Sequence, residues 1–110
     1  MKTLLTLLFA FALSTATGSV ASAADLAAGA AKAKEVCSAC HGVNGNSVDP
    51  SFPRLAGQHP DYLAKALRDY KSGDRNNAIM KGFAAALSKQ DIENLSAYFS
   101  AQQSVLSIKY

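Results

Sequence analysis

Two cysteines and one histidine are the residues of this chain with the most specific chemistry. Cys37, Cys40 and His41 form the spacing C-x-x-C-H, which is the attachment sequence of c-type haem. On a helix the two thiols lie about one turn apart, so both can bond to the two vinyl groups along one edge of a porphyrin. The histidine that follows is placed to bind the iron from one face. The sequence therefore predicts one covalently attached haem c with His41 as an axial ligand of its iron.

Three other uses of this motif compete with haem attachment. Cys37 and Cys40 are the only cysteines, and a disulfide between them would leave His41 without a role. A thioredoxin-like dithiol requires a strand before the first cysteine, whereas the residues here favour a helix. A structural zinc site needs four ligands and would have to recruit the distant His59. Haem attachment accounts for all three residues of the motif and is the preferred interpretation.

Met80 is the expected second axial ligand. Met1 and Met80 are the only methionines, and Met1 belongs to a segment that we expect to be removed. Met80 follows His41 by 39 residues, which is enough chain to pass round the haem edge and reach the opposite face. Its polar neighbours indicate a loop between helices, although methionine also commonly fills apolar gaps. His59 is the competing ligand, but it precedes Pro60 at a helix start, so we expect a capping or surface residue.

The first residues of the chain predict export. Lys2 is followed by an apolar run over 4–13 and by small residues at 21–23, which is the pattern of a secretory signal peptide cleaved after Ala23 or Ala24. The apolar run is about half of the ~20 residues that cross a bilayer, so we expect no membrane anchor. The predicted organisation is a signal peptide over 1–23 and one haem-binding domain over 24–110.

The domain is expected to be all-α, with three helices separated by loops. Small residues and spaced apolar positions predict a helix over 25–39 that carries the haem motif at its C-terminal end. Pro60 starts a second helix, which ends at Ser72 and Gly73. The apolar face that this helix should bury consists of Tyr62, Leu63, Ala66, Leu67 and Tyr70. Ser88 and Asp91 resemble a capping box that opens the last helix. The first and last helices have to pack on each other to close the core.

The charge of the chain gives no support to a nucleic-acid partner. Without Lys2, ten basic residues face eight acidic residues, so the net charge is +2. Basic runs, internal repeats and low-complexity linkers are missing from the sequence. We therefore expect a single small domain that binds no nucleic acid.

The chain resembles the class I c-type cytochromes, and in particular one half of the dihaem bacterial cytochromes c of the c-four type. The residues that carry this resemblance are 37–42, 52–59, 61–63, 70–73, 75–77, 79–80 and 87–99. It implies a small class I cytochrome c fold, with N- and C-terminal helices packed around a covalently bound haem, and a cytochrome c domain over 24–110 in the periplasm. It also implies that the backbone carbonyl of Pro53 binds the outer nitrogen of His41.

The expected function follows from the two iron ligands. An iron held by His41 and Met80 has no free position for a substrate, and the thioether favours the ferrous state. We therefore expect a one-electron carrier, not an enzyme, whose iron cycles Fe(II)/Fe(III) between a redox protein donor and a redox protein acceptor. Two alternatives remain open. One is a five-coordinate haem that binds gases or acts as a weak peroxidase, and the other is a fixed electron-transfer subunit of a periplasmic dehydrogenase or oxidase. An exposed apolar tail would indicate such a subunit, and the residues that could form it are Val105, Leu106, Ile108 and Tyr110.

Overall fold

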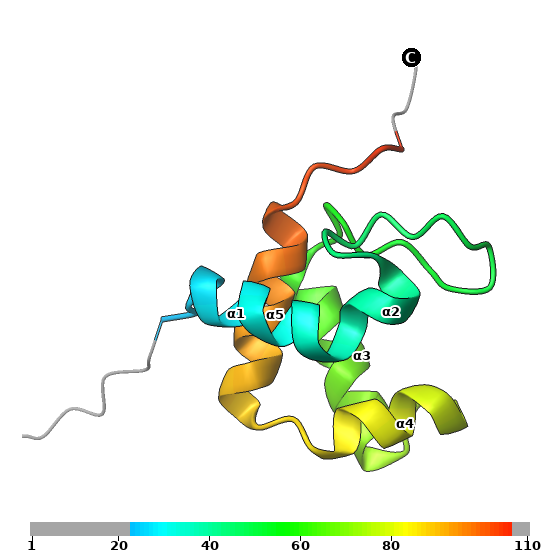
Figure 1. The fold of residues 1–110 in the computed structure, drawn as a ribbon. Helices are drawn as coiled ribbons and strands as arrows, with labels where there is room; N and C mark the ends of the chain where they lie inside the picture. Colours follow the sequence, from blue (N-terminus) through cyan, green and yellow to red (C-terminus); the bar gives the residue numbers. More distant parts are fainter. Residues whose placement is uncertain (1–22, 107–110) are drawn as a thin grey trace, which may run out of the picture.

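The computed structural model describes residues 23–106, so the signal peptide predicted over 1–23 lies outside the described residues except for its last position. In chain order the elements are α1 (Leu26–Lys32), the π-helix η1 (Ala33–Cys37), α2 (Ser38–His41), α3 (Pro60–Ser72), α4 (Ala78–Ala85) and α5 (Lys89–Ala101), as Figure 1 shows. The described part of the chain contains no strand, so the all-α prediction is confirmed and the thioredoxin-like alternative is wrong. Within 23–106 we find no helix with the length and apolar character of a bilayer-spanning segment.

The first three elements form one continuous helical stretch that ends on the haem motif, as predicted. Asp25 caps it, because its side chain accepts a hydrogen bond from the backbone N–H of Ala28 at 3.0 Å. The π-helix η1 was not predicted. A π turn holds more residues than an α turn, so it changes the direction in which the cysteines project from the stretch. The irregular element thus contains Cys37 and ends three residues before Cys40.

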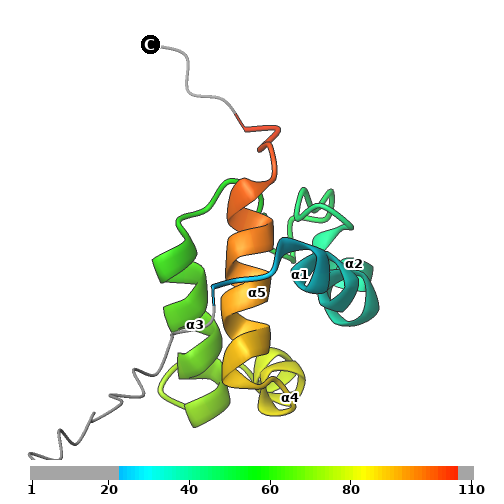
Figure 2. The ribbon, with the colours of Figure 1, turned by 90° about the vertical axis from the view of Figure 1, so that its left-hand side faces the viewer.

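Helix α1 crosses α5 at very short range, which confirms that the first and last helices pack on each other (Figure 2). The crossing point is Gly29, which is buried. A Cβ atom added to Gly29 would lie only 2.2 Å from the backbone carbonyl oxygen of Asn94. The N–H of Asp25 also donates a hydrogen bond to the side-chain oxygen of Asn94 at 2.8 Å. Only a residue without a side chain allows the two backbones to come this close.

Helices α3 and α5 lie side by side and supply most of the core (Figure 2). Helix α3 begins at Pro60 and ends at Ser72, and Gly73 caps it in a left-handed conformation with φ of 93°. The buried cluster consists of Ala33, Leu63, Ala64, Ala84, Leu87, Ile92, Leu95 and Phe99. The prediction that Tyr62 is buried is wrong, since 50% of its surface is exposed. Its ring lines a cavity beside the core.

Met80 lies in a helix and not in the predicted loop. Helix α4 begins after Asn77, whose side-chain oxygen accepts a hydrogen bond from the backbone N–H of Met80 at 3.0 Å. Alanines at three of its eight positions favour the helical state. Ala84 is the one residue of α4 that is buried. The helix was missed because Gly82 and the polar residues before Ala78 resemble loop sequence.

The capping box of α5 gives a prediction about acid stability. The backbone N–H of Ser88 donates to the Asp91 carboxylate at 2.9 Å, and the N–H of Asp91 donates to the Ser88 hydroxyl at 3.0 Å. The bond from the Ser88 N–H, supported by the charge of Lys32, holds the pKa of Asp91 below its usual value of 3.8. Because the folded state lowers this pKa, the contribution to stability is complete above pH ~4 and is lost as the pH falls through the folded pKa.

Asp91→Asn is therefore expected to flatten the acid dependence of stability. Its free energy of unfolding should fall less between about pH 5 and pH 2 than that of the wild type. Ser88→Ala, which removes the other half of the box, should cost about 1 kcal/mol at neutral pH. Urea unfolding of the holoproteins at a series of pH values measures both effects. An equal fall in the wild type and Asp91→Asn would contradict the assignment.

Candidate cofactor site

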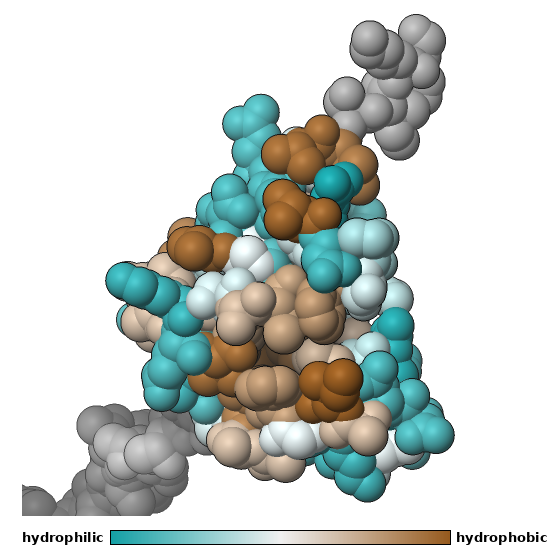
Figure 3. Space-filling model, turned by 45° about the vertical axis from the view of Figure 1, so that its right-hand side comes forward, coloured by the Kyte–Doolittle hydropathy of each residue, from teal (hydrophilic) through white to brown (hydrophobic). Residues whose placement is uncertain are grey.

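A cavity of about 310 Å³ opens between α2, the loop over 51–58, α3, α4 and α5. On the face seen in Figure 3, apolar side chains gather around a hollow. The cavity brings together all the residues predicted to form the site, namely Cys37, Cys40, His41, Pro53 and Met80. The competing ligand His59 does not line it. His59 is exposed on the surface and its side chain makes no capping bond.

His41 is held with one ring nitrogen free to bind a metal. Only 7% of its surface is exposed, and its Nδ1 lies 2.8 Å from the backbone carbonyl oxygen of Pro53. Because a carbonyl only accepts, Nδ1 carries the proton and Nε2 keeps its lone pair. The ring of Phe52 packs edge-on against the imidazole, with centroids 6.4 Å apart. These contacts fix both the tautomer and the direction of the ring.

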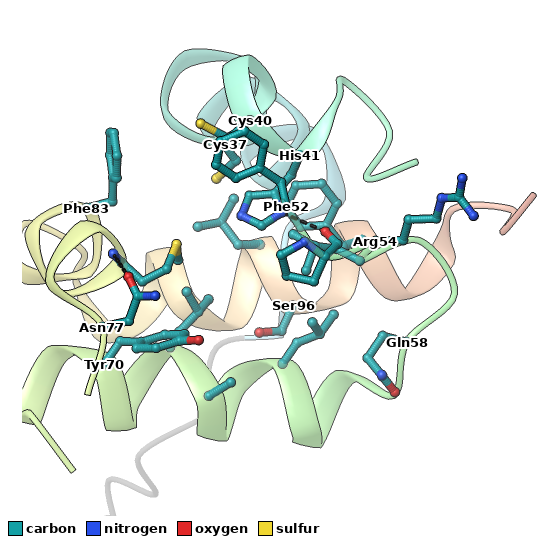
Figure 4. Close-up of a pocket in the computed structure, with 18 of the residues that line it drawn as sticks. Cys37, Cys40, His41, Phe52, Arg54, Gln58, Tyr70, Asn77, Phe83 and Ser96 are labelled. Atoms are coloured by element: carbon teal, nitrogen blue, oxygen red, sulfur yellow. Dashed lines mark hydrogen bonds between the residues drawn. The ribbon is translucent and has the colours of Figure 1, made fainter. Parts of the chain in front are cut away.

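The two thiols lie next to this imidazole on the same helical stretch (Figure 4). Both cysteines are free and half-buried. Burial raises the pKa of the Cys37 thiol from 9.0 to about 11, so this thiol is neutral at physiological pH. The side chains therefore present two unpaired sulfur atoms to the apolar cavity, at the spacing that the sequence requires.

The segment that carries Met80 forms another wall of the cavity. Figure 4 shows Asn77 and Phe83 on the side of the cavity away from Arg54 and Gln58. Met80 belongs to the same helix as Phe83, is partly buried and lines the same space as His41. The fold thus brings a thioether and an imidazole, 39 positions apart in the sequence, to one cavity.

The chemistry of these side chains fits one covalently attached haem c. Such a haem is attached through two thiols, and its iron is bound by an imidazole nitrogen and a thioether sulfur, all of which line this cavity. Most of the remaining wall is apolar, with Leu55, Leu63, Leu67, Leu95 and Phe99 among its residues. One observation points to a missing polar partner. The hydroxyl of Ser96 lies in this wall and is the only buried side-chain oxygen or nitrogen within 23–106 that has no hydrogen-bond partner.

Several residues of the cavity were not predicted as site residues. Arg54 and Gln58 line it and would offer a cation and an amide to the two carboxylates of a haem. The Nε of Arg54 donates a hydrogen bond to the backbone carbonyl of Ser47 at 2.9 Å, which fixes the direction of the guanidinium group. The sequence marked this region as a haem-side loop, and Pro53 was the one residue in it to which the resemblance gave a role. A lone arginine in a loop carries no signal that distinguishes a ligand-binding residue from a solvated one.

Comparison with known proteins shows what the chain is similar to. The cytochrome c family model matches residues 26–103. Cytochrome c4 of Pseudomonas aeruginosa is 49% identical over 87 residues, covering 79% of this chain and 43% of that protein. Cytochrome c-554(548) of Halomonas halodenitrificans is 40% identical over 84 residues, covering 74% of this chain and all of that protein. The crystal structure of cytochrome c4 from Pseudomonas stutzeri has a TM-score of 0.71 at 45% identity, over 76% of this chain and 48% of that one. The chain spans about half the length of the cytochrome c4 relatives that it matches.

Proposed function

The chain belongs to the cytochrome c family and has the class I cytochrome c fold, and we propose that it is a periplasmic monohaem carrier of single electrons between two redox proteins. The observation that carries this proposal is the shared cavity of His41 and Met80. Cys37 and Cys40 would hold the haem by two thioether bonds, and His41 and Met80 would hold its iron. When bound, haem c supplies an Fe(II)/Fe(III) couple that accepts and releases one electron.

The other residues of the site serve to keep these ligands in place. The Pro53 carbonyl keeps the proton on Nδ1 of His41, which leaves Nε2 as the ligand atom and raises its basicity. The Asn77 cap fixes the backbone of Met80 at the start of α4. If His41 and Met80 held the iron in both oxidation states, the apolar wall around it would have little to rearrange when an electron is transferred.

The proposed location follows from the first residues of the chain, and the proposed absence of catalysis follows from the two iron ligands. Residues 1–23 would be a signal peptide cleaved after Ala23 or Ala24, and residues 24–110 would be the exported cytochrome c domain. Because His41 and Met80 would fill both axial positions, a substrate would find no place on the iron. The protein is then a carrier and not an enzyme.

Optical spectra of the holoprotein test this proposal. We expect a low-spin spectrum, a far-red sulfur-to-iron band in the oxidised protein, and no response of the reduced protein to carbon monoxide. A high-spin spectrum that changes promptly with carbon monoxide would instead indicate an open iron and the gas-binding or peroxidase alternative. Size exclusion of the purified protein separates a free carrier from a fixed subunit, since a stable complex of defined stoichiometry would contradict the free carrier.

A further inference from the structure

Helix α4, which carries Met80, packs against α3 but buries only one of its residues. Ala84 is its one buried residue, while Ile79 and Phe83 line the cavity and expose 61% and 48% of their surfaces. Most helix stability in proteins comes from the packing of an apolar face. Since α4 has only eight residues and buries one of them, the contacts that join its two ends to α3 add to the packing that holds it in place.

The attachment before α4 is made by Arg75. Its guanidinium carbon lies 4.9 Å from the ring centroid of Tyr70 and 6.0 Å from that of Tyr62, both on α3. Its Nη1 donates a hydrogen bond to the hydroxyl of Tyr62 at 3.2 Å. Its backbone N–H donates to the carbonyl of Asp69 at 3.0 Å. Both the side chain and the backbone of Arg75 thus fasten the connection between α3 and α4.

The attachment after α4 is made by Lys71, again from α3. Its ammonium group donates a hydrogen bond to the backbone carbonyl of Leu87. The helix that carries Met80 is therefore connected to α3 at both ends by cationic side chains. The two attachments differ in kind, since Lys71 makes one bond to a carbonyl, whereas Arg75 combines two aromatic faces with a hydroxyl acceptor.

We propose that Arg75, held between Tyr62 and Tyr70, is the positioning residue that keeps α4, and with it Met80, at the haem cavity. This inference rests on the proposed function, because it takes Met80 as an iron ligand. Arg75 would act through the backbone of 75–77 and not through contact with the iron. Without the contacts of the Arg75 side chain, the local opening of α4 would cost less free energy than it does in the wild type. Met80 would then leave the iron more often, and an external ligand would bind.

Carbon monoxide binding to the reduced holoprotein measures this opening. In Arg75→Leu we expect carbon monoxide to bind at concentrations that leave the wild type unchanged, because the opening of α4 should become about ten-fold more favourable through the loss of a cation–π contact and a hydrogen bond. Arg68→Leu is the matched control. This variant removes the same type of side chain and the same charge, but Arg68 lies on α3 and forms an ion pair at 3.4 Å with Glu93 of α5. We expect no change in carbon monoxide affinity for this control.

Tyr62→Phe separates the hydroxyl from the ring. Tyr62→Phe alone should raise the affinity for carbon monoxide less than Arg75→Leu does. Combined with Arg75→Leu it should raise the affinity no further, because both changes break the same contact. The global unfolding midpoint should move no further in Arg75→Leu than in Arg68→Leu. Equal carbon monoxide affinities in the two arginine variants, or additive effects of Arg75→Leu and Tyr62→Phe, would overturn the inference. A wild type without the far-red sulfur-to-iron band would instead refute the proposed function, independently of any variant.

Discussion

Replacement of Met80 by alanine is expected to leave haem attached through Cys37 and Cys40 while the reduction potential falls and the reduced protein binds carbon monoxide. The thioether ligand favours the ferrous state, so its loss favours the ferric state. The expected fall is on the order of 0.2 V, a fraction of the ~0.8 V over which axial ligands set haem potentials. Potentiometric titration and carbon monoxide spectra of the purified variant measure both effects.

Ile79→Ala is the matched control for this experiment. Ile79 precedes Met80 in α4, is 61% exposed and lines the same cavity, but it offers no ligand atom. We expect its potential to stay near that of the wild type and carbon monoxide to remain excluded. If Met80→Ala kept the wild-type potential and spectrum, the sixth ligand would have to be another residue.

The second large effect is expected at Gly29, where an alanine should lower the free energy of unfolding by about 3 kcal/mol, the upper end of the usual cost of overpacking. The added Cβ would lie 2.2 Å from the Asn94 carbonyl oxygen and 2.8 Å from its carbonyl carbon. Both are backbone atoms of α5, so no side-chain rotation relieves the contact. The two helices would have to separate, and with them the segment that carries the haem motif.

Gly82→Ala provides the opposite case in the same chain. A Cβ on Gly82 meets no atom within 4 Å, and alanine is the better helix former by up to about 1 kcal/mol. This variant should be as stable as the wild type or more stable. Urea unfolding of the two holoproteins gives the comparison. Equal stability of Gly29→Ala and Gly82→Ala would show that α1 and α5 do not approach as closely as described.

Features set by a few neighbouring residues could be predicted from the sequence. Pro60 and Gly73 mark the ends of α3, and Ser88 with Asp91 marks the start of α5, because each signal acts within about one helical turn. The haem motif falls at the end of its helical stretch for the same reason. These local signals were sufficient for the all-α fold class, whereas the packing of the first and last helices was predicted from the need to close one core.

Features that depend on distant residues could not be predicted in this way. Helix α4 has apolar residues at helical spacing, Ile79, Met80, Phe83 and Ala84, but it is only eight residues long and its polar neighbours and Gly82 indicated a loop. Ser96 is a polar residue on the inner face of α5, and only the fold shows that it lines the cavity. The side chain of Arg75 is held by Tyr62 and Tyr70 of α3, which were expected to be buried in the core. Each of these residues takes its role from the cavity, which no single segment of the chain forms.

The crossing of α1 and α5 also determines the order in which the domain can be completed. The bond between Asp25 and Asn94 joins positions 69 residues apart, and contacts of such separation form slowly because a long loop has to close first. During synthesis the thiols of the haem motif emerge well before the thirteen residues of α5. A chain truncated before Lys89 would keep every residue predicted to bind haem, yet α1 would have no helix to pack on. We expect such fragments to be degraded by proteases or to aggregate and not to fold into a smaller version of the protein.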